Sequence, residues 1–487
     1  MLHKDFIERT KNLLLDEYNE FEASLDMQQV VSIRTNPCKP AEAYNSLISD
    51  NAENVPWCKT GIYLSERPSF TFDPLFHAGT YYVQEASSMF PEQAISRILT
   101  DADMAGKQIT ALDLCAAPGG KSTHLQTLLP EGSLLVSNEV IRSRSMILAE
   151  NMAKWGIPDN IVTNNDPKEL GRLTNLFDII VADMPCSGEG MFRKDIDSRG
   201  EWSIDNVRLC ASRQRRIIHD VWNALKPGGW LIYSTCTFNT EENEENVYSL
   251  TQELGAEIIP IPVKNEWNIT GALCHDIPVY RFFPHRAKGE GFFLALMRKK
   301  GQNTEIKKTK NNNQQATIPA HIKDMLSEPE KFSFYMRKKS AGESKQPEKQ
   351  QTKYTQESAI INAIPKIHDN VYNTLAANLN IISAGVVLGE LKGKDFIPSV
   401  QLAMSTKLRR DVLPSVDLSY GQSIKYLQKE AIILPEETPT GYVLITFRNV
   451  PLGFVKNIGN RANNLFPQEW RIRKQLNNEN SFNRLIV

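Results

Sequence analysis

The sequence predicts an α/β protein built around a Rossmann-like, doubly wound sheet, with a small α+β unit before it and a β-rich module after it. Strand and helix patterns alternate between residues 76 and 298, as in a parallel sheet covered by helices. Near the start of this region, ALDLCAAPGGKSTHLQ (residues 111–126) reads as a buried strand, a turn and the start of a helix. After residue 358, short alternating strands separated by turns predict the β-rich module.

Composition limits the class of protein. The 487 residues, enough for two or three domains, are 41% hydrophobic and 23% charged with a formal net charge of −1, so any nucleic-acid surface must be local. Seven cysteines form no C-x-x-C pair, which argues against a disulfide framework or a zinc site and favours a reducing, cytoplasmic compartment. No apolar run approaches the roughly 18 residues of a membrane span. We expect a monomer without a metal.

The first 75 residues predict the small α+β unit. Apolar and charged residues recur with helical spacing over Asp5–Leu25, so a helix is expected there. Two strands follow, VVSIRTNP (residues 30–37) and Gly61–Leu64. Arg34 and Asn36 stand at the end of the first strand, where they could contact an RNA phosphate or simply face the solvent.

Residues 76–300 predict the main domain. One helix, Asp205–Leu225, is stopped by the KPGG sequence that follows it. The acidic run EENEEN (residues 241–246) is interpreted as the solvated first turn of the next helix, capped by Asn239 or Thr240. The other expected elements are strands at Ile109–Leu114, Ser133–Val140, Ile161–Thr163, Phe177–Asp183 and Trp230–Thr235, and helices at Gln84–Leu99, Lys121–Leu129 and Ser143–Trp155.

The alternating pattern breaks after residue 300. Between Arg298 and Lys353 the chain has fourteen Lys and Arg against six Asp and Glu, so residues 301–357 predict a basic, flexible linker with one helix near His321–Ser327. Residues 358–432 predict an α/β segment with a helix at Tyr420–Lys429, and residues 433–487 predict the β-rich module.

The β-rich module carries cations beside aromatic rings. GNRANNLFPQEWRIRK (residues 459–474) places arginines next to Phe466 and Trp470, a combination suited to irregular or single-stranded RNA, although a small β-barrel would bury such rings equally well. The candidate RNA-binding residues of the whole chain are Arg34, Asn36, Lys456, Arg461, Arg471 and Arg473.

The turn CAAPGGK (residues 115–121) is suited to a ligand that lies against the backbone. Its end, Gly120-Lys121-Ser122, resembles a phosphate-binding P-loop, which would make the protein an ATPase, but the first glycine of that motif is replaced by Cys115. S-adenosylmethionine needs no phosphate cradle. It needs an acid for its ribose at the end of the next strand, where Glu139 stands.

Two cysteines follow neighbouring strands of the predicted sheet. DMPCSG begins at Asp183 and STCT begins at Ser234, so Cys186 and Cys236 are expected to converge on one crevice. A thiolate that adds to C6 of a pyrimidine makes C5 nucleophilic enough to take a methyl group, and a second group can help to expel the thiol. The carboxyl group of Asp183 could stabilise the charge near N3 of the ring. Two unrelated buried cysteines are the alternative.

Together, CAAPGGK, DMPCSGEG and STCTF resemble the RNA cytosine-C5 methyltransferases of the Nol1/Nop2/Sun family, and the tail resembles a PUA-like RNA-binding module. The resemblance implies a class I methyltransferase fold that uses S-adenosylmethionine to methylate cytosine C5 in small-subunit (16S) ribosomal RNA. It also implies that Cys236 is the nucleophile and that Cys186 assists release. The implied cofactor-binding residues are the backbone of Cys115, Ala116, Ala117, Pro118, Gly119, Gly120 and Lys121, with Glu139 at the ribose, Asp166 at the adenine and Asp183 between the methionine moiety and the base.

Three other functions stay open on the sequence alone. Transfer RNA could replace ribosomal RNA as the substrate of the same chemistry. A P-loop ATPase is the second alternative. The third is a non-catalytic RNA-binding factor for ribosome assembly that keeps the methyltransferase fold.

Overall fold

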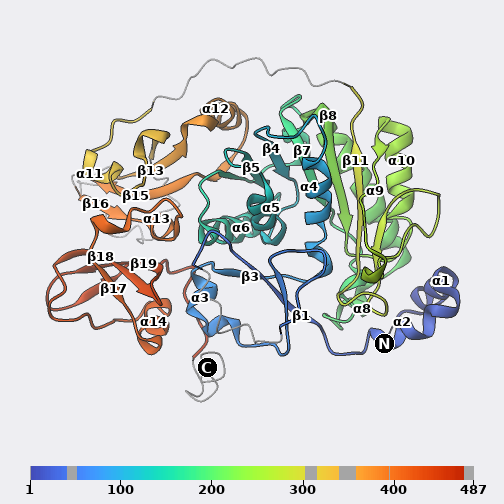
Figure 1. Ribbon diagram of the computed structural model, residues 1–487, viewed down its shortest axis with the longest axis horizontal. Helices are drawn as coiled ribbons and strands as arrows, with labels where there is room; N and C mark the ends of the chain where they lie inside the picture. The colour runs from blue at the N-terminus through green and yellow to red at the C-terminus, as the bar shows by residue number, and fades with distance from the viewer. Residues whose placement is uncertain (1, 41–51, 302–314, 339–357, 394, 476–487) are drawn as a thin grey trace, which may run out of the picture.

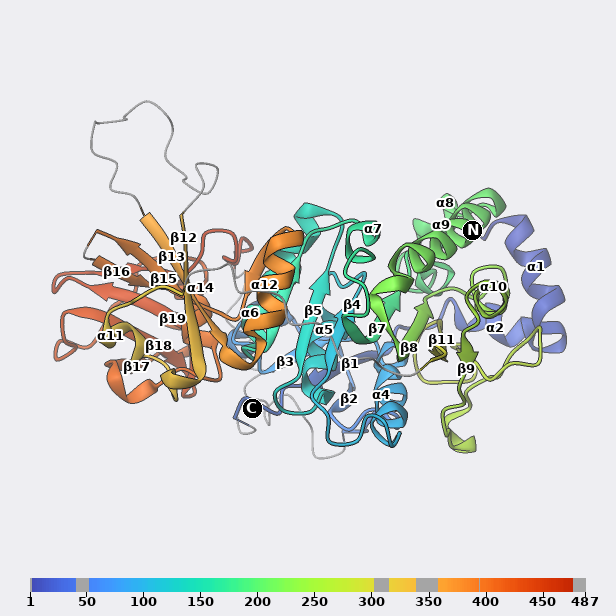
Figure 2. The same ribbon diagram turned by 90° about the horizontal axis from the view of Figure 1, so that it is seen from above.

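The computed structural model describes residues 2–40, 52–301, 315–338, 358–393 and 395–475. A central sheet with helices on both faces lies in the middle of the molecule (Figure 1). Seen from above, the C-terminal units lie at one end and the N-terminal helices α1 and α2 at the other (Figure 2). Within these described ranges, no helix combines the length and the apolar composition needed to cross a bilayer.

Five parallel strands form the centre of the sheet, in the order β8-β7-β4-β5-β6. The expected parallel pairing of the fourth and fifth predicted strands is confirmed, since Asp183 at the end of β7 pairs with Ser234 near the end of β8. Two antiparallel strands, β11 and β10, continue the sheet beyond β8. The bounds are β4 (Thr110–Asp113), β5 (Leu134–Asn138), β6 (Asn160–Thr163), β7 (Phe177–Asp183), β8 (Leu225–Thr235), β9 (Glu257–Ile258), β10 (Tyr280–Phe282) and β11 (Phe292–Arg298).

Successive residues of the central strands point into two separate cores, because side chains alternate across a sheet. Ala111 faces the core formed with α4, α5 and α6, whereas Leu112 faces the core formed with α9 and α10. The helices are α4 (Pro91–Leu99), α5 (Gly120–Leu128), α6 (Arg142–Trp155), α7 (Pro167–Leu170), α8 (Ser198–Glu201), α9 (Ile204–Val221) and α10 (Glu244–Leu254).

The predicted helix at Gln84–Leu99 is wrong in its first half. Strand β3 (Tyr81–Val83) and a 3-10 turn at Ser87–Met89 precede α4, which begins at Pro91. Proline is tolerated at the first helical position because that position needs no amide hydrogen for the helix. The apolar spacing of residues 84–90 therefore reflects burial of a loop under the sheet, with Met89 and Phe90 fully buried.

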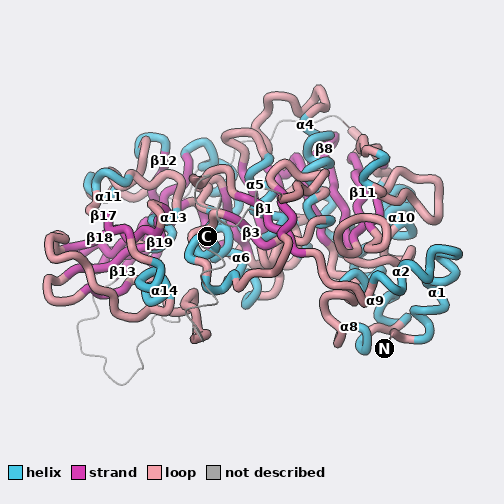
Figure 3. Tube along the Cα trace, turned by 60° about the horizontal axis from the view of Figure 1, so that its bottom comes forward, coloured by secondary structure: helices cyan, strands magenta, loops and turns pink. Residues whose placement is uncertain are grey.

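The N-terminal unit is divided between two places. Helices α1 (Lys4–Leu14) and α2 (Tyr18–Ser24), separated by a 3-10 turn, pack against Phe192, Trp202 and Phe238 of the main domain. Strands β1 (Val31–Thr35), β2 (Gly61–Leu64) and β3 form a separate sheet in the order β2-β1-β3. Because β3 lies beyond residue 75, this unit extends further than the predicted boundary. Figure 3 shows β1 and β3 beside α5 and α6.

The sequence interpretation of Arg34 and Asn36 as RNA contacts is wrong, because both side chains are fully buried. Arg34 donates to Gln84 Oε1 at 2.9 Å and to Thr123 Oγ1 at 2.6 Å, which fixes β1 against α5. Asn36 donates to the carbonyl oxygens of Gly79 and Trp155 at 2.9 and 3.0 Å. A strand end that contacts RNA and one that is buried inside the protein carry the same polar residues in the sequence. Here other elements of the protein cover the end of β1.

Replacing Asn36 with alanine should therefore affect stability and not RNA binding. The variant leaves two buried carbonyl oxygens without a donor, which costs about 1–3 kcal/mol of unfolding free energy. Denaturant unfolding measures this loss, with the exposed Asn54→Ala as the matched control. An RNA affinity that falls and a salt dependence that flattens, at unchanged stability, would contradict the structural role.

The predicted linker is partly structured. Residues 315–338 contain α11 (Ala320–Lys323) and β12 (Phe332–Lys338), and β12 pairs with β13 (Ser358–Pro365) along its whole length. The predicted helix near His321 is thus confirmed as one short turn. Residues 302–314 and 339–357 of the predicted linker lie outside the described part of the chain.

The segment after the linker joins the main sheet. Strand β14 (Ile381–Ala384), which follows helix α12 (Asp369–Asn378), pairs antiparallel with β6 and so extends the central sheet at its far edge. Strands β12, β13, β15 (Val386–Lys392) and β16 (Asp395–Pro398) form a second, four-stranded sheet, followed by α13 (Val400–Met404).

The last module is a four-stranded sheet with one helix. It contains β17 (Ser415–Asp417), α14 (Tyr420–Leu427), β18 (Gly441–Phe447), β19 (Val450–Asn457) and β20 (Ala462–Asn464). Because β17 pairs with β18 and α14 shares the same core, the module begins before the predicted boundary at residue 433. This core also contains Ile33 and Tyr81, so the module packs on the N-terminal sheet and on α3 (Pro74–His77).

Candidate active site

The glycine turn connects β4 to α5 and is held from the side by α6. Arg144 Nη2 donates to Ala117 O at 2.8 Å, and Asn151 Nδ2 donates to Pro118 O at 2.8 Å. Gly119 has φ +114°, and a Cβ there would lie 3.3 Å from Leu148 Cδ1. The turn therefore needs glycine both for its backbone conformation and for its close approach to α6.

The two side chains that a P-loop would use for nucleotide binding are engaged elsewhere. Lys121 Nζ lies 2.8 Å from Asp183 Oδ2, and Ser122 Oγ donates to Asp113 Oδ2 at 2.7 Å. Ser122 is also fully buried, so its hydroxyl is not available to a magnesium ion. Although burial acts to lower it, the carboxylate of Asp183 raises the pKa of Lys121. This arrangement argues against the ATPase alternative.

Asp113, at the end of β4, is a site residue that sequence reasoning missed. It is fully buried, and its Oδ1 atom has no hydrogen-bond partner in the described part of the chain. The pKa of Asp113 is raised from 3.8 to about 7. Burial is the main cause, the hydrogen bond from Ser122 acts against it, and the neighbouring Asp183 adds to it. In the sequence, the position of Asp113 directly before the turn motif could have indicated that it belongs to the site.

The raised pKa predicts how stability depends on pH. Folded Asp113 keeps its proton up to about pH 7, whereas the unfolded chain loses it near pH 4, so its contribution to stability is present at low pH and is lost as pH rises. Between about pH 5.5 and pH 7, the unfolding free energy of the wild type should fall by about 2 kcal/mol relative to Asp113→Asn. Denaturant unfolding at each pH measures this difference. Parallel curves for wild type and Asp113→Asn would contradict the prediction.

The two other acids predicted for the cofactor follow the ends of β5 and β6. Glu139 is buried, accepts a hydrogen bond from Ile141 N at 2.9 Å and lies 3.3 Å from Arg144 Nη1. It adjoins the turn, since Ala116 N donates to Asn138 O at 2.9 Å. Asp166 is exposed and caps α7, accepting from Lys168 N at 2.9 Å. Both acids therefore stand at the edge of the sheet where the turn lies, Glu139 beside it and Asp166 at a helix start.

Cys186 and Cys236 meet as predicted. Their Sγ atoms are 3.1 Å apart, and both side chains are half-buried. The approach of the two loops depends on Gly190, where a Cβ would lie 2.8 Å from Cys236 O and 2.7 Å from Gly291 O. The hydrogen bond to Cys236 and then burial raise the pKa of Cys186 well above its ordinary value. Cys186 is therefore a thiol that keeps its proton.

Asp183 links the cysteines to the glycine turn. Ser234 Oγ donates to its Oδ1 at 2.8 Å, while Lys121 from the turn contacts its Oδ2. The carboxylate is one-third exposed, so it is fixed in direction and still accessible. The predicted nucleophile, its neighbouring thiol and the acid thus lie just after the carboxyl ends of β7 and β8, and Lys121 links the acid to the predicted cofactor turn.

The interpretation of EENEEN as a solvated acidic run is wrong, because Glu242 and Glu244 are fully buried. Glu242 accepts from Ser187 N at 3.0 Å, from Gln214 Nε2 at 2.7 Å and from Asn239 Nδ2 at 2.8 Å, and so holds the chain just after Cys186. Burial raises the pKa of Glu242 to about 7. Glu244 pairs with Arg281, which is also buried.

Comparison with known proteins identifies the family of the chain. Three family models match the chain: the N-terminal domain of 16S rRNA methyltransferase RsmF at residues 2–86, 16S rRNA methyltransferase RsmB/F at residues 95–298, and the RsmF PUA domain at residues 413–472. The ribosomal RNA small subunit methyltransferase F of Aliivibrio fischeri (strain MJ11) is 30% identical over 476 residues, which are 93% of each chain. The chain belongs to the ribosomal RNA small subunit methyltransferase F family.

Two further similar proteins are consistent with this family assignment. The protein of the same name from Shewanella loihica (strain ATCC BAA-1088 / PV-4) is 29% identical, covering 91% of this chain and 92% of the relative. A solved methyltransferase homologue from Pyrococcus horikoshii is 26% identical with a TM-score of 0.52, covering 61% of this chain and 95% of that one. The predicted fold and the PUA-like module are confirmed, and so is the prediction of an S-adenosylmethionine-dependent methyltransferase.

The remaining RNA-binding candidates lie in the PUA-like module. Arg461, Arg471 and Arg473 are exposed, whereas Lys456 is half-buried with its Nζ atom 5.4 Å from the centre of the Tyr442 ring. The nearby aromatic residues are structural, since Phe466 is fully buried and Trp470 packs between Phe466 and Lys154 of α6. The exposed arginines and the half-buried Lys456 stay candidates for contact with RNA phosphates.

Proposed function

We propose that this enzyme methylates C5 of a cytosine in small-subunit (16S) ribosomal RNA through a covalent bond between Cys236 and C6 of the base. The observation that carries the proposal is the contact of Cys236 with Cys186 at the strand ends that Asp183 and Lys121 connect to the glycine turn. S-adenosylmethionine, when bound, supplies the methyl group as an electrophile. The glycine turn and Glu139 fit it, because the turn leads directly into the start of α5 and the acid adjoins the turn.

Cys236 acts first, as the nucleophile. Its sulfur forms a bond to C6, and the electron pair displaced from the C5–C6 double bond makes C5 able to attack the methyl group. Asp183, oriented by Ser234 and Lys121, is placed to interact with the N3 side of the ring as charge develops there. After transfer, loss of the C5 proton to a base restores the double bond and breaks the bond from C6 to sulfur.

Cys186 assists this last step. Since its pKa is raised and its sulfur lies 3.1 Å from that of Cys236, it can donate a hydrogen bond to the departing thiolate. A hydrogen bond to the leaving group lowers the barrier to elimination without forming a second covalent bond.

Ribosomal RNA is the proposed substrate because the relatives are named as small-subunit ribosomal RNA methyltransferases and the PUA-like module presents exposed arginines. Methyl transfer from labelled S-adenosylmethionine to separated RNA fractions, followed by mapping of the modified base, tests the proposal. We expect one 5-methylcytosine in the small-subunit RNA and none with Cys236→Ser. Methylation of transfer RNA alone would contradict the substrate, and methylation at another base atom would contradict the chemistry.

A further inference from the structure

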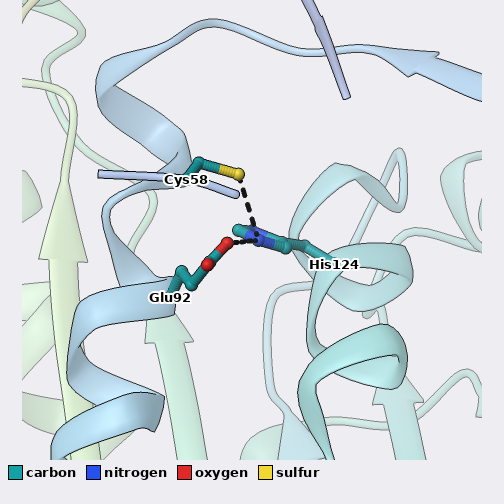
Figure 4. A group of neighbouring side chains, drawn as sticks. All are labelled: Cys58, Glu92 and His124. Carbon is teal, nitrogen blue, oxygen red and sulfur yellow. Dashed lines mark hydrogen bonds and ion pairs between the residues drawn. The ribbon is translucent and has the colours of Figure 1, made fainter. Parts of the chain in front are cut away.

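Three side chains of the kinds that bind metal ions meet inside the protein, away from the active-site crevice. Cys58 precedes β2, Glu92 lies in the first turn of α4, and His124 lies in α5, one helical turn after Lys121 (Figure 4). Their exposed fractions are 3%, 1% and 1%. We refer to these three residues as the CEH cluster. Nothing in the proposed methyl transfer uses it.

The spacing of the CEH cluster suits a small tetrahedral ion. His124 Nε2 lies 3.1 Å from Glu92 Oε2 and 3.6 Å from Cys58 Sγ, and the three ligand atoms all lie within 4.8 Å of one another. With zinc bonds of about 2.3 Å to sulfur and about 2.0–2.1 Å to nitrogen and oxygen, tetrahedral angles separate sulfur from nitrogen by about 3.6 Å and nitrogen from oxygen by about 3.4 Å. The two contacts made by Nε2 are therefore close to those of two zinc ligands.

Without an ion, the hydrogen bonds of the cluster converge on the carboxylate of Glu92. His124 uses the same nitrogen, Nε2, toward both neighbours, and a ring nitrogen carries either one hydrogen or one lone pair. If Nε2 donates to Glu92, the thiol of Cys58 interacts with Glu92 or Thr60 instead of with Nε2. A cation between the three atoms would use the lone pair of Nε2, the carboxylate and a thiolate together.

Arg34 places a buried positive charge near the cluster. Its guanidinium is fully buried and interacts electrostatically with Cys58 and Glu92, and its Nη1 atom has no hydrogen-bond partner in the described part of the chain. Binding of a soft cation would displace the proton of the Cys58 thiol, and the resulting thiolate would add to the negative charge with which Arg34 interacts.

We propose that the CEH cluster is a zinc site in which Cys58 Sγ, His124 Nε2 and a carboxylate oxygen of Glu92 supply three of the four tetrahedral positions, the fourth being left to a water molecule. A thiolate, an imidazole and a carboxylate together form a ligand set for zinc. Magnesium and calcium prefer oxygen ligands, so the thiolate and the imidazole do not suit them. The ion would join the loop before β2, the start of α4 and the middle of α5, and so fix the N-terminal sheet to the helix that begins at the glycine turn. The ligands lie more than thirty positions apart, which is why cysteine spacing in the sequence indicates no such site.

Cobalt substitution tests the site in the full-length protein, because a thiolate bound to Co²⁺ absorbs in the near ultraviolet and a tetrahedral Co²⁺ ion absorbs in the visible. The protein is produced in cobalt-supplemented, zinc-depleted medium, since a buried site takes up its ion during folding. Bound metal is counted by elemental analysis. Cys58→Ser and His124→Gln each remove one ligand. Cys236→Ser and Cys274→Ser are the matched controls, because the active-site thiols and the half-exposed group Glu245, Cys274 and His275 could also bind metal.

We expect about one equivalent of cobalt per wild-type chain, with both absorption bands, and loss of the bands in Cys58→Ser and His124→Gln but not in the two controls. Zinc-loaded wild type should unfold about 5 °C above the metal-free protein, and His124→Gln should show no such difference, which keeps the test valid if Cys58→Ser does not fold. No bound metal in the wild type, or bands that persist without Cys58, would overturn the site. Methyl-transfer activity is measured separately, so the outcome does not depend on the proposed reaction.

Discussion

Cys236→Ala is expected to lower methyl transfer by at least about 10⁴-fold and to form no covalent complex with RNA, because the variant lacks the atom that bonds to C6. Cys186→Ala should behave differently. Its Cys236 still adds to the base, but the departing sulfur loses the thiol 3.1 Å away, so a protein–RNA adduct that survives denaturation should accumulate. Denaturing gel electrophoresis after incubation with small-subunit RNA and S-adenosylmethionine distinguishes the two variants.

Cys274→Ala is the control for this pair, since Cys274 is a half-exposed thiol on a loop beside α10. It should methylate RNA at the wild-type rate and trap no adduct. An adduct in Cys236→Ala together with none in Cys186→Ala would exchange the two roles. The absence of an adduct from both variants would remove the support for covalent catalysis.

Asp183→Asn is expected to slow the methyl-transfer step by about 10²–10³-fold, the usual cost of removing a preorganised group that stabilises charge in a transition state. Asparagine keeps the size of the side chain but removes the charge that pairs with Lys121. It also replaces one of the two oxygen atoms that accept from Lys121 and Ser234. Single-turnover kinetics measures the step. Cofactor affinity, measured by calorimetry without RNA, separates this effect from a loss of S-adenosylmethionine binding.

Ser234→Ala provides the graded comparison. It removes one of the two hydrogen bonds to Asp183 and keeps the charge, so a loss of about tenfold is expected. If Asp183→Asn and Ser234→Ala slowed the reaction equally, the orientation of the carboxyl group would matter and its charge would not. A rate for Asp183→Asn within a few fold of the wild type would exclude the proposed role at N3.

Local sequence was sufficient to predict the site residues that lie at the ends of neighbouring parallel strands. Asp183 ends one apolar strand and Ser234 lies near the end of the next, and parallel strands bring their carboxyl ends to one edge. The meeting of Cys186 and Cys236 could therefore be predicted without coordinates. The glycine turn was predictable for the same reason, since a strand, a turn and a helix start occur within sixteen residues.

Burial by distant segments could not be predicted in this way. Arg34 and Asn36 have the composition of an exposed strand end, but α5 and the end of α6 cover them. Glu242 belongs to an acidic run typical of a solvated helix start, but Ser187, Gln214 and Asn239 surround it with donors. A charged residue shows in the sequence only its own polarity, whereas its environment depends on which element packs over it.

By itself, the sequence determined the doubly wound sheet, the glycine turn and the crevice with two thiols, because hydrophobic periodicity and strand-end motifs act over short distances along the chain. Only the tertiary structure decided that β14 extends this sheet at its far edge, that Asp113 is buried beside the turn, and that Cys58, Glu92 and His124 meet. Each of these features joins segments separated by tens to hundreds of residues, and no local pattern records which of them will pack together.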